Sequence, residues 1–433
     1  MPRERKRGDT EMKETDHVKK MLAFIQSSPT CYHAVENAGR ELEKAGYGQL
    51  QENERWELAM GGKYYVTRNG SSLIAFQLPA GKPKGFHMIA SHGDSPCFKL
   101  KESPEIRVED AYVKLNVEKY GGAILSTWLD RPLSVAGRVV LAGGAGVRNV
   151  AIGRDLLVIP NLAIHMNPDI NKGMEYNVQN DMLPLYAEGD SGKPFMELVA
   201  EEMGILSEDI LGSDLFLYNR EKGRRFGVRG EFVCAPRLDD LACVYTSLQA
   251  MLRGKPETYA NLLVIFDNEE VGSTTKQGAA STFLQDTLMR ITESLEMTRE
   301  DYSRLLADSF MISADNAHAV HPNHPEKADP TNRPYLNRGI VIKHHGSQKY
   351  TTDAVSAAAI KNICIQAGVP WQNYANRSDI AGGSTLGNIS AAQVPVSTAD
   401  VGLAQLAMHS AYETAGAEDI GYMIRMMEHF YIG

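Results

Sequence analysis

Short runs of apolar residues that stop abruptly at polar residues are the main pattern in this chain. The clearest run, residues 262–266, reads Leu-Leu-Val-Ile-Phe and is followed by Asp267-Asn268-Glu269-Glu270. Similar runs cover residues 64–67, 72–78, 85–90, 310–313 and 339–343. Their length and composition predict buried strands. The polar residues that follow would then lie at the carboxyl ends of strands, the edge where open α/β sheets bind ligands.

Helices are predicted where apolar residues recur at three- and four-residue spacing. Residues 18–25 and 34–45 give two amphipathic helices separated by Ser-Ser-Pro-Thr. Residues 241–252, 279–297 and 354–367 also read as helices. The helix at 241–252 has the spacing of one buried on a sheet, and it would place Asp239 and Asp240 at its N-terminus.

The segment 98–231 differs from the sequence on either side of it. It contains short strand-like runs at 135–141 and 156–159, frequent Gly and Pro, and a helix-and-loop piece at 195–210, but no strand followed by a carboxylate cluster. We therefore expect an inserted second domain at 98–231 and a catalytic domain formed by 17–97 and 232–433. Residues 1–16 are charged and show no periodic pattern, which predicts a mobile tail.

Composition narrows the class of protein. The chain has 433 residues and a formal net charge of -9, with a pI near 5.8, which argues against a nucleic-acid binder. No apolar run approaches the roughly 18 residues needed to span a membrane, and no signal peptide is recognised, so a cytoplasmic location is expected. The 5 cysteines are scattered and odd in number, so any metal would be held by His and carboxylate groups.

Two of the polar strand ends carry pairs suited to metal chemistry. Of Glu269 and Glu270, one could hold a metal ion while the other takes a proton from water; the alternative is a solvated acidic turn. His92 and Asp94 would lie on the same side of an extended chain, where the carboxylate can orient a metal-binding imidazole. Without the other polar strand ends that offer metal ligands, His92 would be interpreted as a core histidine.

Strand or element ends together offer a ligand set for two ions. The candidates are His92, Asp239, Glu270, Asp315 and His409. An N-terminal capping role would explain one Asp of the 239–240 pair but not both, and a carboxylate can bridge two cations, so Asp239 is the candidate bridge. Two imidazoles and three carboxylates would then hold two zinc ions, each with an open position for water. Packing alone does not explain the gathering, because uncompensated carboxylates repel.

At this point the sequence resembles a known family, the aspartyl aminopeptidases, dizinc exopeptidases that also include the yeast vacuolar aminopeptidase. The resemblance is carried, in order along the chain, by Ser91-His92-Gly93-Asp94, Pro236-Arg237-Leu238-Asp239-Asp240, Asp267-Asn268-Glu269-Glu270-Val271-Gly272-Ser273, Ser313-Ala314-Asp315-Asn316-Ala317-His318 and Met408-His409-Ser410. It implies a doubly wound α/β catalytic domain with a mixed sheet, interrupted by a β-rich dimerisation domain. It also implies a homo-oligomer of dimers, typically a dodecamer.

The resemblance further implies a role for each residue of the site. Asp239 would bridge two zinc ions, with His92 and Asp315 completing one shell and Glu270 and His409 the other. Glu269 would be the general base and Asp94 the partner of His92.

Three residues gain a substrate-binding role only from the resemblance. His165, which its apolar run would otherwise make a core residue, matches a histidine that reaches the active site of a neighbouring subunit. His318 and Lys343 match positions that line the pocket for the substrate side chain. Lys343 is associated with preference for N-terminal Asp or Glu, although its sequence context alone would make it a solvent-facing strand end.

The expected function is therefore removal of the N-terminal residue from short peptides with a free N-terminus, with preference for Asp or Glu. Some family members prefer Leu, so a broad or Leu-type specificity is the alternative. Two other classes remain open from the residues: another hydrolase on the same dizinc scaffold, such as a carboxypeptidase or deacylase, and a non-catalytic oligomeric shell. The shell is disfavoured because Glu269 and every candidate ligand are present.

Overall fold

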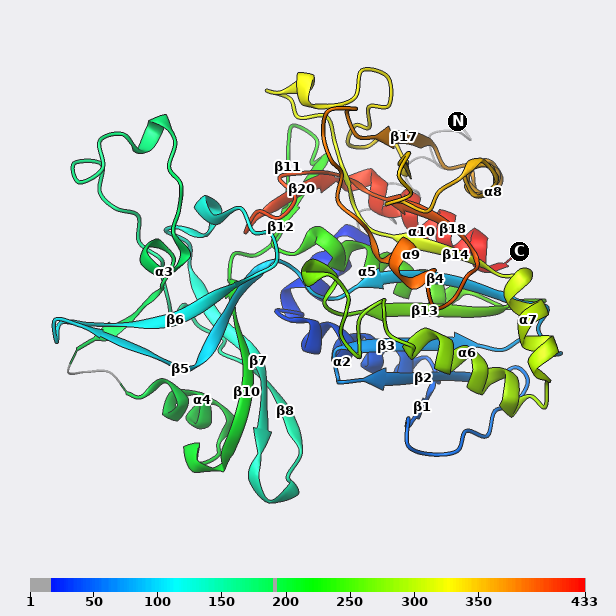
Figure 1. Cartoon of the computed structure of the whole chain (residues 1–433), viewed down its shortest axis with the longest axis horizontal. Helices are drawn as coiled ribbons and strands as arrows, with labels where there is room; N and C mark the ends of the chain where they lie inside the picture. Colours follow the sequence, from blue (N-terminus) through cyan, green and yellow to red (C-terminus); the bar gives the residue numbers. More distant parts are fainter. Residues whose placement is uncertain (1–16, 190–192, 433) are drawn as a thin grey trace. The chain divides into compact units, whose positions relative to one another are not determined.

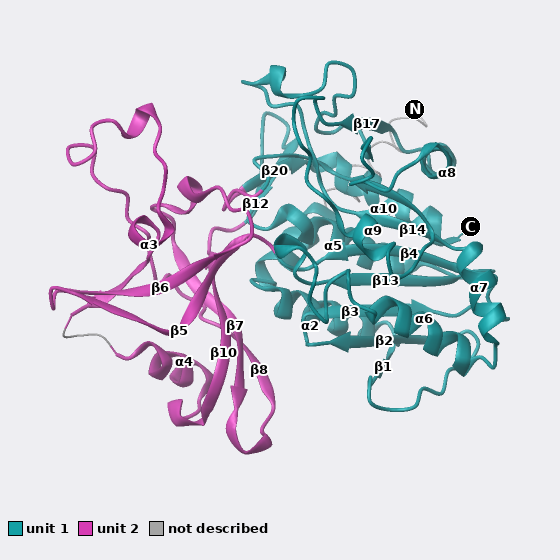
Figure 2. Cartoon of the chain, viewed as in Figure 1, with its two compact units in different colours: residues 1–94, 223–408, 413–433 teal, residues 95–222, 409–412 magenta. Residues whose placement is uncertain are grey.

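The computed structural model describes residues 17–189 and 193–432, so the tail predicted at residues 1–16 lies outside the described residues. The chain forms two compact units (Figure 2). Unit 1 contains the described residues up to Asp94, Gly223–Met408 and the chain from Glu413 onward; unit 2 contains Ser95–Lys222 and His409–Tyr412. These divisions lie close to the boundaries expected at 97/98 and 231/232. The short segment 409–412 is an addition that the sequence analysis did not separate.

A mixed nine-stranded sheet forms the centre of unit 1, in the order β1-β2-β3-β13-β4-β14-β18-β16-β17 (Figure 1). Its strands are β1 (Gly48–Leu50), β2 (Lys63–Arg68), β3 (Ser72–Gln77), β4 (Phe86–His92), β13 (Ala260–Phe266), β14 (Phe310–Ala314), β16 (Ile340–His344), β17 (Trp371–Ala375) and β18 (Ser397–Gly402). The central neighbours β13, β4, β14 and β18 are parallel, whereas β3 and β16 pair antiparallel with the two ends of that block. The carboxyl ends of four adjacent strands therefore share one edge.

Helices cover both faces of this sheet, which makes the fold doubly wound. One face packs against α2 (Cys31–Lys44), α5 (Leu238–Arg253), α8 (Ala354–Ala367) and α10 (Ala417–Ile432), together with the helical residues 17–27. The other face packs against α6 (Phe283–Ser294), α7 (Arg299–Ala307) and α9 (Leu386–Ser390) (Figure 1). Along β13, Leu263 and Ile265 enter the first core, while Leu262 and Val264 enter the second. This alternation explains why the run is apolar throughout.

Unit 1 also contains a small five-stranded sheet, ordered β11-β12-β20-β19-β15. Its strands are β11 (Arg224–Phe226), β12 (Phe232–Ala235), β15 (Ala317–His318), β19 (Ala404–Leu406) and β20 (Glu413–Gly416). Because β15 and β19 directly follow β14 and β18, this sheet fixes the chain where it leaves the carboxyl edge of the large sheet.

Unit 2 is a six-stranded antiparallel sheet with its own apolar core. The order is β8-β7-β10-β5-β6-β9, with strands β5 (Cys97–Val108), β6 (Tyr112–Tyr120), β7 (Leu133–Leu141), β8 (Val147–Ala151), β9 (Leu185–Glu188) and β10 (Ile210–Asn219). Two short helices, α3 (Val178–Asp181) and α4 (Phe195–Met203), belong to the same unit. The architecture matches the expected α/β fold with an inserted β-rich segment.

Two predicted elements differ in the structure. Residues 156–159 form no strand, because Leu157 and Val158 each make one isolated bridge, to Leu133 and Leu185 respectively, and Ile159 is buried in the core of unit 2. Their apolar pattern reflects burial and not strand pairing.

The helix predicted at 279–297 begins only at Phe283 and ends at Ser294. The preceding residues turn back onto the end of β13, where Thr275 and Gln277 donate hydrogen bonds to the Asn268 side chain at 2.8 Å. Among the described residues, no helix combines the length and the apolar character needed to cross a membrane.

Candidate metal centre

The turn after β13 brings two glutamates to the carboxyl edge of the large sheet. Asn268 has a φ of 59°, a left-handed conformation that Asn tolerates better than most residues. The chain then forms a short 3-10 turn, Glu269–Val271, so only Asp267 and Asn268 separate the end of the strand from the acidic pair. Gln277 and Thr275 hold this turn through the Asn268 side chain.

The N-terminal end of α5 brings a second acidic pair to the same edge. Asp239 and Asp240 are both buried and have non-helical backbone angles, although they lie at the start of the helix. The N–H of Asp239 donates to Glu413 Oε2 at 3.0 Å, and a carboxylate oxygen of Asp240 accepts from the backbone N–H of His92 at 3.3 Å. Tertiary contacts therefore hold the Asp239 backbone and direct the Asp240 carboxylate, and neither contact is a helix cap.

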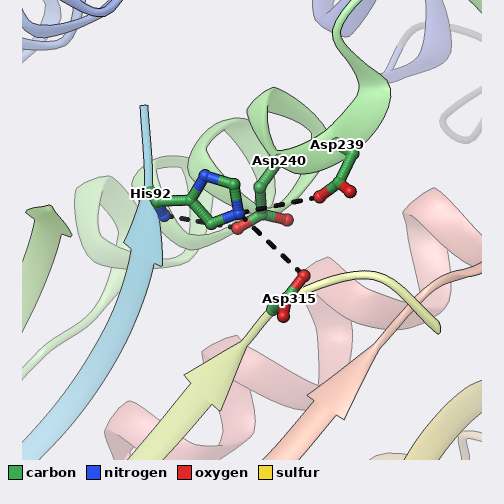
Figure 3. A group of neighbouring side chains, drawn as sticks. All are labelled: His92, Asp239, Asp240 and Asp315. Atoms are coloured by element: carbon green, nitrogen blue, oxygen red, sulfur yellow. Dashed lines mark hydrogen bonds and ion pairs between the residues drawn. The ribbon is translucent and has the colours of Figure 1, made fainter. Parts of the chain in front are cut away.

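His92 and three aspartates form a compact buried group (Figure 3). His92 Nε2 lies 3.7 Å from Asp239 Oδ1 and 4.0 Å from Asp315 Oδ1. Asp240 completes the group, in which one ligand atom from each residue lies within 4.8 Å of the others. His92 also groups in this way with Glu269 and Glu270. The end of β4, the end of β13, the end of β14 and the start of α5 thus meet at one place.

Asp315 depends on a close approach of two strand ends. Its backbone N–H donates to the Val401 carbonyl at 2.9 Å, and a Cβ added at Gly402 would lie 2.0 Å from the Asp315 carbonyl oxygen. Only glycine therefore fits where β18 passes the residue after β14.

Asp94 connects the histidine to the glutamate turn. His92 Nδ1 lies 3.1 Å from the Asp94 backbone carbonyl oxygen and 3.4 Å from Asp94 Oδ1. The role of Asp94 as the partner of that ring stays a prediction. The two Asp94 carboxylate oxygens also accept the backbone N–H groups of Glu269 and Glu270, each at 3.2 Å. One buried residue thus contacts the imidazole, through its backbone carbonyl and its carboxylate, and holds the turn that carries the glutamates.

The electrostatics of the group favour a cation. Burial raises the pKa of Glu269 to about 8 and that of Glu270 well above its ordinary value, and neighbouring aspartates add to both shifts. Burial likewise raises the pKa of Asp240. For His92, burial would lower the pKa, but Asp94, Asp240 and Glu269 outweigh it and raise the pKa well above its usual value. Imidazole and carboxylate are zinc ligands, and a divalent cation would offset this mutual repulsion, so the residues present fit a metal ion.

The predicted substrate-binding residues have different environments. Lys343 is buried, at 2% exposure, and its Nζ lies 3.1 Å from Asp315 Oδ2, so the alternative of a solvent-facing strand end is wrong. Burial would lower the pKa of Lys343, but Asp315, Tyr350 and Asp400 together raise it. His318 is exposed in β15 with its ring 6.1 Å from that of Tyr374.

The two predicted site residues that lie in unit 2 are described within that unit. His165 is exposed, which contradicts the reading of its apolar run as core. His409 has its Nδ1 3.1 Å from the Gly122 carbonyl oxygen. Its role as a metal ligand stays a prediction.

Sequence reasoning missed two residues of the site. It mentioned Asp240 only as the neighbour of Asp239, although Asp240 joins the group around His92. Glu413 is buried and accepts the Asp239 N–H from a strand far along the chain. Its only sequence signal is a charged residue at the start of a short strand, which does not indicate a partner.

A doubly wound domain with a buried imidazole and several carboxylates at its strand ends belongs to the class of metal-dependent hydrolases. The chain matches the family model described as aminopeptidase I zinc metalloprotease (M18) over residues 24–431. A probable M18 family aminopeptidase 2 from Clostridium acetobutylicum is 46% identical over 428 residues, which cover 96% of this chain and 99% of the relative. The chain therefore belongs to the M18 family of zinc metallo-aminopeptidases, enzymes that hydrolyse N-terminal residues.

Solved structures show the same fold. A chain of the cryo-EM structure of an Ape4 and Nbr1 complex superposes with a TM-score of 0.93 and 35% identity, covering 97% of this chain and 86% of that one. The structure of the S. cerevisiae mApe1 dodecamer superposes with a TM-score of 0.83 and 27% identity, covering 96% of each chain.

Proposed function

We propose that this aminopeptidase binds two zinc ions per subunit, with Asp239 as the bridge. His92 and Asp315 would complete one shell, and Glu270 and His409 the other. The observation that carries the proposal is that His92 Nε2 lies 3.7 Å from Asp239 Oδ1 and 4.0 Å from Asp315 Oδ1 at the carboxyl edge of the sheet. An imidazole whose Nδ1 contacts a carbonyl, as in His409, can coordinate a metal through Nε2.

Glu269 is the general base of the proposed reaction. Bound zinc ions would supply polarisation of the scissile carbonyl and of the attacking water. Glu269 accepts the proton of that water and returns it to the leaving amine, which needs a carboxylate with a pKa not far from neutral. Asp94 supports this role because it holds the backbone N–H of Glu269 and fixes the turn that aims the side chain.

The proposed substrates are short peptides with a free N-terminus, and the proposed preference is for Asp or Glu. The buried ammonium of Lys343 would attract a substrate carboxylate strongly, because charges interact more strongly away from water. His318 would line the same pocket.

A preference for neutral residues is the second candidate. Lys343 already pairs with Asp315 at 3.1 Å, and its Nζ lies 5.1 Å from the centre of the Tyr350 ring. A cation that is neutralised in this way attracts a second carboxylate less strongly. The relative rates on Glu and Leu substrates decide between the two candidates.

We also propose assembly into a homododecamer built from dimers, in which unit 2 forms the dimer contact. A dodecamer is the assembly named for the S. cerevisiae relative. The cytoplasmic location expected from the sequence stays a prediction.

The experiment combines elemental analysis with a small substrate panel. The purified enzyme should contain about two zinc ions per subunit and should cleave Asp-, Glu- or Leu-p-nitroanilide. Peptides with an N-acetylated first residue should resist cleavage, because a site that reads the free amine ignores blocked substrates. Cleavage of the blocked peptides would favour a deacylase or carboxypeptidase on the same scaffold.

A further inference from the structure

The carboxylate of Asp400 is a buried junction between three segments of unit 1. Asp400 is fully buried in the middle of β18. Its Oδ1 accepts hydrogen bonds from Ser313 Oγ at 2.6 Å and Thr385 Oγ1 at 2.7 Å. Its Oδ2 accepts from the backbone N–H and the hydroxyl of Thr351, at 2.6 and 2.7 Å. The Asp400 N–H donates to Thr352 Oγ1 at 2.8 Å.

Strand register places this junction beside the metal ligand and the buried lysine. Asp400 pairs with Ser313 across β14 and β18, and residues two apart on a strand face the same side, so Asp315 extends toward the same side as Asp400. Along its other edge, β18 pairs antiparallel with β16, and Ile342 lies opposite Val401. The next residue of β16, Lys343, therefore lies opposite Asp400. The neighbouring strands β14, β18 and the overlying α9 can be followed in Figure 1.

Apart from Ser313 in β14, the donors come from two segments that have no regular secondary structure. Thr351 follows Tyr350, whose ring lies near Lys343 Nζ. Thr385 ends the irregular segment 381–385 and directly precedes α9. Lys349 Nζ donates to the Gly382 carbonyl at 2.7 Å, so the two segments also contact each other. Asp400 is thus the point at which both are fastened to the sheet.

The atoms around this junction are closely packed, and they leave no room for a side chain at Gly387. A Cβ added at Gly387 would lie 2.8 Å from Ser313 Oγ and 3.1 Å from Asp400 Oδ1. A buried carboxylate is costly unless several donors surround it, and here each donor either belongs to one of the two irregular segments or to the strand that leads to Asp315. A purely structural strand position would be filled at lower cost by an apolar residue.

We propose that Asp400 is a positioning residue for substrate specificity, which holds segments 345–352 and 381–385 as the wall of the pocket beside Lys343. The inference rests on the proposed function, in which Lys343 lines the pocket for the substrate side chain. Asp400 does not touch the reacting atoms. Loss of one of its oxygens releases a wall of the pocket, whereas Asp315 keeps the hydrogen bond of its N–H to the Val401 carbonyl.

The test compares Asp400→Asn and Thr351→Val with the control Asp419→Asn in the zinc-loaded enzyme. Asp419 is also a buried carboxylate in unit 1, and it accepts the N–H groups of Asn337 and Gly339 before β16, at the end opposite Lys343. For each variant, zinc content, kcat and KM are measured with Glu-, Leu- and Ala-p-nitroanilide. Thr351→Ser, which keeps the hydroxyl, serves as the conservative rescue.

The expected result is a rise in KM of about tenfold for the Glu and Leu substrates in Asp400→Asn, with kcat and the Ala substrate little changed. Thr351→Val should show a smaller shift of the same kind, and Thr351→Ser and Asp419→Asn should keep the wild-type ratios between substrates. Proportional losses on all three substrates, or the same change of ratio in Asp419→Asn, overturn the proposal. If Asp400→Asn does not fold, Thr351→Val decides alone by the same criteria.

The proposed role of Lys343 and the proposed role of Asp400 can be contradicted independently of each other. If Lys343→Met leaves the Glu to Leu ratio unchanged, the role of Lys343 in acidic specificity is wrong. The Asp400 inference is then still decided by the Leu to Ala ratio, which does not depend on charge.

Discussion

At the scale of single residues, the adjacent carboxylates of Glu269 and Glu270 differ in their proposed roles because different charged groups surround them. After burial, the largest charge effect that raises the pKa of Glu270 comes from Asp239, whereas for Glu269 it comes from Asp315. The proposed bridging residue thus has the larger charge effect on Glu270, and the proposed ligand Asp315 has the larger one on Glu269. Asp94 fixes the backbone of both residues because it accepts both backbone N–H groups.

The first prediction separates a base from a ligand. Glu269→Gln keeps the shape of the side chain but cannot accept a proton, so kcat should fall by roughly two or more orders of magnitude while zinc content is unchanged. Glu270→Ala is the matched comparison on the adjacent residue, and it should lower the zinc content measured by elemental analysis. Full turnover in Glu269→Gln, or unchanged zinc in Glu270→Ala, would contradict the corresponding role.

The second prediction concerns the buried lysine. Lys343→Leu should lower kcat/KM for N-terminal Asp and Glu by roughly 2 kcal/mol or more, the scale of a broken buried charge pair, and leave Leu substrates little changed or improved. Since Lys343 also pairs with Asp315, the zinc content of the variant must be measured beside its kinetics. Equal losses on acidic and neutral substrates, together with loss of zinc, would mean that Lys343 supports Asp315 and that specificity is set elsewhere.

At the scale of elements, the strands that carry the site could be predicted because they are buried on both faces. The run at 262–266 is apolar throughout, and the runs at 85–90 and 310–313 are mostly apolar, with His87 and Ser313 as polar members. All three strands end within two residues of the predicted positions. The helix predicted at 354–367 has the predicted bounds, because Asp353 caps its start and Gly368 adopts the left-handed conformation after its end.

The remaining parts of the site depend on contacts between distant segments. Glu413 reaches Asp239 from another sheet, and Asp400 collects hydroxyl groups from two irregular segments. No periodicity or spacing marks such pairs. The predicted start of α6 was wrong for a similar reason, since the Ala280 N–H donates to the Ser273 carbonyl at 3.1 Å and not to a helical partner.

The third prediction concerns Asp419 in α10, whose carboxylate accepts hydrogen bonds from the chain just before β16. Burial raises the pKa of Asp419 to about 7, although two backbone N–H groups oppose the shift. The folded pKa lies above the unfolded value near 3.8, so the folded state favours the protonated form. The stabilising contribution of this group is therefore complete below about pH 4 and is lost as the pH rises through about 7, on the order of 4 kcal/mol in total.

The measurement is the thermal midpoint of wild type and Asp419→Asn between pH 5 and 8. Asparagine cannot ionise, so the variant should lack this loss of stability. Its thermal midpoint relative to that of wild type should therefore increase as the pH rises. A difference that is constant across this range would show that Asp419 has the same protonation state in the folded and unfolded chains.

At the scale of the whole molecule, the insertion carries exposed apolar side chains that unit 2 itself does not cover. Around His165, Leu162, Ile164 and Met166 are exposed by 47%, 53% and 72%. A cluster of this kind on one turn is typical of a surface that contacts another chain. It suits the resemblance-based expectation that His165 acts in the active site of a neighbouring subunit.

The fourth prediction is that two inactive variants restore activity when they are assembled together. His165→Ala should lower kcat/KM by about 100-fold, the scale of losing one positioned donor, without changing the assembly state measured by light scattering. Glu269→Gln is inactive in its own site but still presents His165. If His165 acts in a neighbouring subunit, oligomers formed by refolding or co-expressing the two variants contain sites with an intact base and a His165 supplied by the other chain. Activity should then recover to a substantial fraction of wild type, whereas mixtures that stay as inactive as the separate variants would place His165 in its own subunit's site or outside any site.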